Sequence, residues 1–248
     1  MSNKRATKAS RRQQPQSNYQ TAENTIHFHQ STKTAARRID LVPKSLGQER
    51  LIIELTDLSK DIVVAVGPAG TGKTYLAMQA AIKALRNGET EKIILTRPAV
   101  GVDDEKHGFL PGDLNQKMEP WTRPLLDVLR EYYHPKDVTR MLEDGTIEIS
   151  PLAFMRGRTF KNSWVIADEM QNATPGQMKM LLTRIGVDSR VIVTGDVEQA
   201  DRATSNNGLM DLGKRLQATG IKGLALCQMT AKDIQRHPII ERVLALYS

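Results

Sequence analysis

The chain has 248 residues, of which 40% are hydrophobic, and this is enough for a buried core in one or two domains without disulfide bonds. Its single cysteine excludes an internal disulfide framework and favours a reducing, cytoplasmic compartment. No segment approaches the roughly 18 consecutive apolar residues of a membrane span, and no apolar segment of a secretory signal follows the first charges, so a soluble protein without a membrane partner is expected.

The net charge of +7 is concentrated in residues 1–40, which hold eight Lys or Arg residues against two acidic ones. This segment is rich in Gln, Ser, Asn and Thr and has few large apolar residues, so it cannot bury enough surface to offset the entropy of ordering. We therefore expect a disordered basic arm over residues 1–40 and a folded domain over residues 41–248. A basic arm favours a polyanionic partner such as nucleic acid, the alternative being a solubilising extension.

A short helix is predicted over residues 49–55, because apolar residues recur there at helical spacing. Gln48 lies just before it and upstream of the phosphate-loop motif described next. Its amide offers a donor and an acceptor, which suit N6 and N7 of adenine. Gln48 is therefore a candidate adenine-binding residue, the alternative being a surface position on the helix.

A complete G-x-x-x-x-G-K-T motif occupies residues 67–74, between the apolar run 62–66 and a helix predicted over residues 73–87. Backbone N–H groups of such a loop face an anion, and the helix adds its positive dipole end. Lys73 is expected to reach the β- and γ-phosphates, and the Thr74 hydroxyl to ligate Mg²⁺. The candidate nucleotide contacts are the loop and the residue after it: Gly67, Pro68, Ala69, Gly70, Thr71, Gly72, Lys73, Thr74 and Tyr75.

The next strand is predicted over residues 92–96, and Pro98 ends it because proline lacks a donor for the ladder. Ligands of open α/β sheets gather beyond the carboxyl ends of the strands, so Thr96 and Arg97 are expected at the functional edge. Residues 99–113 then predict a long surface loop. An amphipathic helix is expected over residues 115–133.

Two arginines, Arg156 and Arg158, follow a short predicted strand over residues 146–149 and are flanked by Phe154 and Phe160. Cationic groups beside aromatic rings are typical of single-stranded nucleic-acid binding. The alternatives are contact with the triphosphate or with a neighbouring subunit, or an ordinary surface loop.

An apolar strand over residues 164–167 ends in Asp168 and Glu169. Asp168 is expected to hold Mg²⁺ through a water, and Glu169 to polarise the attacking water. An acidic residue directly after the magnesium aspartate favours hydrolysis over phosphoryl transfer to a metabolite. We therefore predict that these two carboxylates complete the triphosphate site.

The C-terminal third continues the alternation of helices and strands. A helix capped by Thr174 is predicted to run to Ile185, a strand follows over residues 190–196, and Gln199 is placed to sense the γ-phosphate. The alternation indicates a parallel sheet with helices on both faces. Before a predicted final helix, Arg236 is a candidate arginine finger, with Arg242 as the alternative.

The chain contains the segments GPAGTGKTYLA (67–77), LTRPAV (95–100), GFLPGDL (108–114), PLAFMRGRTF (151–160), VIADEMQNATPGQMKMLLTRIG (165–186), VTGDVEQAD (193–201) and RHPIIERV (236–243). Together these segments resemble the PhoH family, phosphate-starvation-type proteins related to the ATPase core of superfamily-one helicases. The resemblance implies a RecA-like domain that binds ATP with Mg²⁺ and hydrolyses it. It also implies phosphate sensing by Gln199 and nucleic-acid contact at Thr96 and Arg97.

Two features limit this resemblance: the loop over residues 100–107 is longer and more acidic than is usual in the family, and no PIN-type nuclease domain is present. The preferred function is a helicase-like ATPase coupled to RNA or single-stranded DNA. The alternatives are a ribonuclease with a regulatory ATP site and a nucleotide-dependent binding switch. Helicases of this type grip nucleic acid between two RecA-like lobes, and this chain supplies one. A homo-oligomer, such as a hexameric ring, is therefore expected to complete each site.

Overall fold

The computed structural model describes residues 38–98, 114–200, 207–236, 239–240 and 246. Its centre is a six-stranded sheet in the order β3-β2-β4-β5-β1-β6, in which every pairing is parallel. This confirms the predicted parallel α/β fold. The strands are β1 (Ile62–Val66), β2 (Lys92–Thr96), β3 (Ile147–Ile149), β4 (Ser163–Ala167), β5 (Arg190–Gly195) and β6 (Leu224–Gln228).

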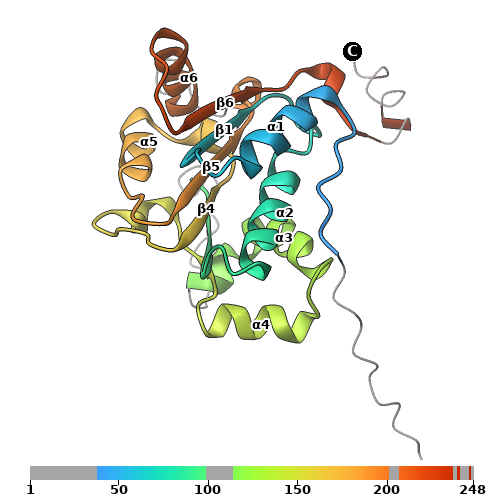
Figure 1. Ribbon diagram of the computed structural model, residues 1–248, viewed down its shortest axis with the longest axis vertical. Coiled ribbons are helices and arrows are strands. Elements are labelled where there is room, and N and C mark those ends of the chain that lie inside the picture. Colours follow the sequence, from blue (N-terminus) through green and yellow to red (C-terminus); the bar gives the residue numbers. More distant parts are fainter. Residues whose placement is uncertain (1–37, 99–113, 201–206, 237–238, 241–245, 247–248) are drawn as a thin grey trace, which may run out of the picture. The chain divides into compact units, whose positions relative to one another are not determined.

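Helices cover both faces of the sheet (Figure 1). Side chains alternate between the faces along each strand, so that Val63 packs against one helical layer and Val64 against the other. One layer is formed by α1 (Leu46–Thr56), α2 (Lys73–Arg86), α3 (Leu114–Arg130) and α4 (Pro135–Glu143). The other is formed by α5 (Pro175–Leu182) and α6 (Gly208–Ala218).

Short 3₁₀ helices follow several strands at the edge of the sheet where the strands end. They are η1 (Leu152–Met155), η2 (Met170–Asn172), η3 (Val197–Gln199) and η5 (Ala231–Asp233). Because the strands are parallel, the turns after β1, β2, β4 and β5 lie at one edge of the sheet. The phosphate-loop motif and the predicted acidic pair are both in these turns.

Capping residues set several helix boundaries. The Thr174 side chain and Gln177 form a reciprocal capping box at the start of α5, which confirms Thr174 as the N-cap. The helix ends at Leu182, before the predicted Ile185. Ser45 caps α1, so this helix begins at Leu46, before the predicted residue 49. Helices α4 and α6 were not predicted.

A buried arginine fastens the C-terminus of α1 to the sheet. Arg190 begins β5 and stacks on Trp164 of β4, with its guanidinium carbon 4.7 Å from the ring centre. Its nitrogens donate to four backbone carbonyl oxygens, those of Glu54, Leu55, Asp57 and Lys60. Arginine suits this place because carbonyl groups at a helix C-terminus lack partners and carry the negative end of the helix dipole.

The predicted basic arm lies outside the described residues, apart from residues 38–40, and Ile39 is already buried in the core. The predicted loop over residues 99–113, most of the predicted final helix and Arg242 also lie outside them. Among the helices that the structure does describe, none has both the length and the apolar character needed to cross a bilayer.

Candidate nucleotide site

The motif predicted as a phosphate loop connects β1 to α2 and depends on its glycines. Gly67, Gly70 and Gly72 have backbone φ values of 152°, 84° and 83°, which residues with a Cβ rarely adopt. A Cβ on Gly67 would also lie 2.5 Å from the carbonyl oxygen of Met229. The curled backbone therefore requires glycine both for its torsion angles and for its close contact with the segment after β6.

Lys73, the first residue of α2, is buried against this loop. Its Nζ donates to the carbonyl oxygens of Gly67 at 2.7 Å and Pro68 at 2.8 Å. Burial lowers the pKa of Lys73, while the charges of Asp196 and two neighbouring carboxylates oppose that change. The ammonium group is thus held by the loop itself, next to the backbone N–H groups at the start of α2.

The Thr74 hydroxyl and Asp168 meet although 94 residues separate them in sequence. Thr74 Oγ1 donates to Asp168 Oδ1 at 2.7 Å, and Thr194 Oγ1 of β5 donates to the same oxygen at 2.6 Å. A carboxylate and two hydroxyl oxygens at one point are the hard oxygen donors that Mg²⁺ prefers. The residues predicted to bind magnesium therefore lie together, and their chemistry fits that ion.

Glu169 lies beside Asp168 in a left-handed backbone conformation, with φ 54°. Its Oε1 forms an ion pair with Arg97 Nη2 at 3.2 Å, and its Oε2 accepts a hydrogen bond from Gln171 Nε2. Gln171 is buried, and its Oε1 accepts from the backbone N–H of Asp196 at 3.0 Å. The carboxylate is thereby connected through Gln171 to the end of β5.

A cavity of about 240 Å³ opens between these groups. Asp196 also reaches the phosphate loop, because its Oδ2 accepts from the Ala69 N–H at 3.0 Å. Asp196 and Gln171 are not among the site residues predicted from the sequence. The cavity is lined by Ala69, Gly70, Gly72, Lys73, Thr74, Tyr75, Asp168, Glu169, Gly195, Asp196 and Gln199.

A family model described as PhoH-like protein matches residues 40–248. The chain belongs to the PhoH-like family. It is 44% identical over 211 residues to a PhoH-like protein of Synechocystis, covering 85% of this chain and 63% of the relative. It is 45% identical to one of Bacillus subtilis, with 82% and 63% covered, and 40% identical to Protein PhoH of Escherichia coli, with 77% and 54% covered. The chain thus spans less than two thirds of the length of these relatives.

Two solved helicase structures also align with this PhoH-like chain. The helicase domain of Pyrococcus furiosus Hef has 11% identity and a TM-score of 0.43, with 75% of this chain and 38% of that chain covered. Pif1 helicase of Candida albicans has 16% identity and a TM-score of 0.40, with 83% and 43% covered.

Two segments from opposite ends of the PhoH-like domain lie against the phosphate loop. Gln48 is buried, and its Nε2 donates to the Thr71 carbonyl at 3.0 Å while its Oε1 accepts from the Lys44 N–H at 2.8 Å. Arg236 Nη2 donates to the Ala69 carbonyl at 3.1 Å. Arg236 therefore contacts the loop of its own chain, whereas an arginine finger acting between subunits would reach a neighbour's site.

Asp233 joins these two segments. Its Oδ1 accepts from the Gly47 N–H at 2.9 Å, and its Oδ2 accepts from the Thr230 N–H at 2.8 Å and the Thr230 hydroxyl at 3.2 Å. Gly47 has no room for a side chain here, because a Cβ would lie 2.5 Å from the Asp233 carboxyl carbon. The buried carboxylate thus fixes the start of α1 to η5, and Gln48 and Arg236 belong to the two segments that it joins.

Of the predicted nucleic-acid residues at the end of β2, Arg97 is accessible and Thr96 is buried. The side chain of Arg97 is 27% exposed. Thr96 is only 1% exposed, and its hydroxyl has no hydrogen-bond partner among the described residues. Arg97 is therefore the residue of this pair that a macromolecule could contact.

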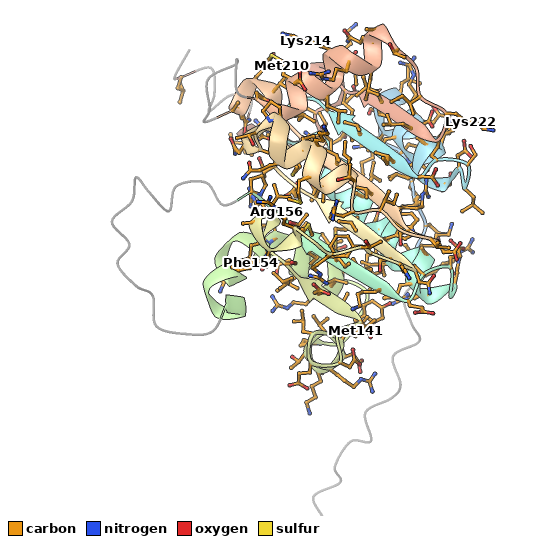
Figure 2. All side chains as sticks on the ribbon, turned by 90° about the vertical axis from the view of Figure 1, so that its left-hand side faces the viewer. Met141, Phe154, Arg156, Met210, Lys214 and Lys222 are labelled. Carbon is orange, nitrogen blue, oxygen red and sulfur yellow. The ribbon has the colours of Figure 1, made fainter. Side chains whose placement is uncertain are left out.

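The two predicted arginines around Gly157 have different surroundings. Arg158 forms an ion pair with Glu148 of β3, which lowers the pKa of that carboxyl, and its guanidinium lies 4.9 Å from the centre of the buried Phe160 ring. Phe154 is 61% exposed and Arg156 is exposed, and Figure 2 shows both on the same side of the molecule. Arg158 is therefore paired with the edge strand β3, while Phe154 and Arg156 are exposed to solvent.

Proposed function

We propose that this PhoH-like domain is a magnesium-dependent ATPase. The observation that carries the proposal is the meeting of Lys73, the Thr74–Asp168 contact and Glu169 around one cavity. Backbone N–H groups of the loop would bind the phosphates, and Lys73 would exchange its carbonyl partners for phosphate oxygens. Bound Mg²⁺, held by Thr74 and by Asp168, would neutralise charge on the β- and γ-phosphates.

Glu169 is the proposed general base, because it is the carboxylate of the cavity that neither holds Thr74, as Asp168 does, nor accepts from the phosphate loop, as Asp196 does. Gln199 is exposed at the rim of the same cavity and is proposed to contact the γ-phosphate. Gln48 and Arg236 both donate to carbonyl oxygens of the phosphate loop, and we propose that these two residues also contact the remainder of the nucleotide.

Two substitutions separate binding from hydrolysis. Lys73→Ala should abolish both, since it removes the cation that the loop holds over the phosphates. Glu169→Gln should retain ATP binding and lower phosphate release by about 10²–10⁴-fold, the usual contribution of a general base. Lys83→Ala, at an exposed position of the same helix, is the matched control and should behave as wild type.

Binding is measured with a fluorescent ATP analogue and hydrolysis by phosphate release, both in Mg²⁺. Failure of the folded wild-type protein to bind magnesium–ATP would reject the proposal. Tight binding without turnover would instead favour a nucleotide-dependent switch. Wild-type hydrolysis by Glu169→Gln would reject the assignment of the base.

We further propose that hydrolysis is coupled to single-stranded RNA or DNA. The support is an exposed aromatic and an exposed arginine, Phe154 and Arg156, on the segment that follows β3. Stacking on an aromatic ring beside a cation suits unpaired bases and their phosphates. Adding uridine or thymidine oligonucleotides to the phosphate-release assay tests this, and an unchanged rate with both would reject it.

Self-association is also proposed, because the described part of the domain forms one parallel sheet and Gln199 is exposed at its nucleotide cavity. A neighbouring subunit would cover the cavity there and could supply an arginine in trans. Sedimentation velocity measures the assembly directly. A monomer with full ATPase activity would contradict the proposal.

A further inference from the structure

Both carboxylate oxygens of Glu169, the proposed general base, contact other side chains of the protein. Arg97 pairs with Glu169 Oε1 and Gln171 donates to Oε2, so these two partners fix the orientation of the carboxylate, and turning it toward a water at the γ-phosphate would strain or break these contacts. Gln171 is buried and is fixed by its second bond to Asp196. Arg97 is the more accessible of the two partners, since its side chain is 27% exposed at the end of β2.

Arg97 is directly connected to the segment that carries Phe154 and Arg156. Its carbonyl oxygen accepts a hydrogen bond from the Leu152 N–H, the first residue of η1, at 3.4 Å. Phe154 lies within η1 and Arg156 follows it, and both side chains are exposed (Figure 2). The backbone of Arg97, whose guanidinium pairs with the proposed base, is therefore hydrogen-bonded to the segment that carries this exposed cation and aromatic ring.

We propose that a backbone phosphate of a single-stranded nucleic acid, bound over Phe154 and Arg156, competes with Glu169 for Arg97 and so frees Glu169 for hydrolysis. This inference rests on the proposed ATPase function. A guanidinium can form two parallel hydrogen bonds with a phosphate as well as with a carboxylate, so the exchange keeps Arg97 paired. Its effect is to make the proposed base available only when the oligonucleotide is bound.

Competition for one arginine has a reciprocal consequence. If phosphate binding releases Glu169, then removing the charge of Glu169 must strengthen phosphate binding by the same free energy. A partly exposed ion pair contributes about 0.2–1 kcal/mol, which corresponds to a change in affinity of at most about 5-fold. The prediction concerns binding alone and can be tested without ATP.

The binding experiment uses a fluorescein-labelled single-stranded uridine oligonucleotide and the full chain without nucleotide. Glu169→Gln should bind it about 1.4- to 5-fold more tightly than wild type, and the gain should disappear when Arg97→Ala is added. Asp137→Asn is the control: it also removes one negative charge and breaks the exposed 3.5 Å pair with Arg140 on α4. It should leave the affinity unchanged.

The hydrolysis experiment measures phosphate release with and without the same oligonucleotide. Arg97→Ala should raise the basal rate and abolish stimulation. Arg97→Lys retains a cation without the paired geometry, so it should show a smaller rise and weaker stimulation. Unfolding midpoints near that of wild type establish that the variants are folded, and Arg97→Lys provides the test if Arg97→Ala is not.

The outcomes distinguish this inference from the function on which it rests. Equal affinities of Glu169→Gln and wild type, or a gain that persists without Arg97, would overturn the competition. A basal rate that stays constant or falls in both Arg97 variants would overturn the release of the base. Absence of wild-type hydrolysis together with tighter binding by Glu169→Gln would reject the ATPase and support the competition.

Discussion

Replacing Asp233 with asparagine tests how firmly the segment after β6 is held beside the phosphate loop. The carboxylate accepts three hydrogen bonds, one from Gly47 and two from Thr230. Asparagine keeps one acceptor oxygen and places an NH₂ group where the other oxygen was. At least one bond to a charged acceptor is lost, and a buried N–H then faces another donor.

The expected loss of unfolding free energy is about 2–3 kcal/mol, since one hydrogen bond to a charged group contributes about 1.5–3 kcal/mol. For a domain of this size each kcal/mol lowers the melting temperature by about 2–4 °C, so a fall of roughly 4 to 12 °C is expected. The affinity for ATP should fall as well, because Asp233 holds the segments that carry Gln48 and Arg236.

The difference in stability between wild type and Asp233→Asn should become smaller as the pH falls. The Thr230 N–H is the main cause that lowers the pKa of Asp233 below its ordinary value of 3.8 in the folded protein. Because the pKa of Asp233 is lower in the folded than in the unfolded protein, its carboxylate stabilises the fold at pH values above the pKa of the unfolded state. This stabilisation is lost as the pH falls through the pKa of the folded state. The gap between wild type and Asp233→Asn should therefore be constant from pH 7 to 5 and narrow below pH 4.

Thermal unfolding followed by circular dichroism, with urea titrations at several pH values, measures both effects. Asp211→Asn is the control, because it breaks the exposed Arg215 pair on α6 and should leave the midpoint almost unchanged. A midpoint of Asp233→Asn within 1 °C of wild type, or a gap that widens in acid, would refute the reasoning.

Three further predictions concern groups outside the cavity. Arg190→Met should lower the unfolding free energy by roughly 2–4 kcal/mol in urea titrations, because it leaves carbonyl groups at the end of α1 without their donor; an unchanged midpoint would contradict this. Burial raises the pKa of Cys227 to about 11, so a disulfide reagent at pH 8 should modify the thiol only after denaturation, and rapid labelling of the native protein would contradict its burial. The Arg158 hydrogen bond lowers the pKa of Glu148, so the stability gap between wild type and Glu148→Gln should shrink as the pH falls below 4.5, and a gap independent of pH would speak against this pair.

The parallel sheet could be predicted from sequence because its strands are buried on both faces and therefore form continuous apolar runs. Strand β2 was predicted with the bounds observed. Helices α4 and α6 give weaker signals: α4 has nine residues after the unusual N-cap His134, and α6 begins with a glycine. A Cβ on Gly208 would lie 2.5 Å from the Thr174 carbonyl, so packing against α5 overrides helix propensity there.

Within the site, the sequence identified residues whose neighbours along the chain define their chemistry. It did not identify Gln171 or Asp196 as a pair, because their contact depends on β4 lying next to β5, and spacing alone does not determine strand order. The different surroundings of the two arginines around Gly157 could not be predicted from sequence spacing either. Arg158 differs from Arg156 because Glu148 of β3 lies within its reach.

The contacts of Gln48 and Arg236 with one loop have a consequence for synthesis of the protein. The loop at residues 67–74 is translated early, whereas Arg236, which contacts it, lies 167 residues after its partner Ala69. A nascent chain translated only as far as residue 200 would lack β6 and the hydrogen bonds of Asp233 with Gly47 and Thr230. Affinity for nucleotide should consequently arise late in translation, when nearly the whole domain has emerged from the exit tunnel.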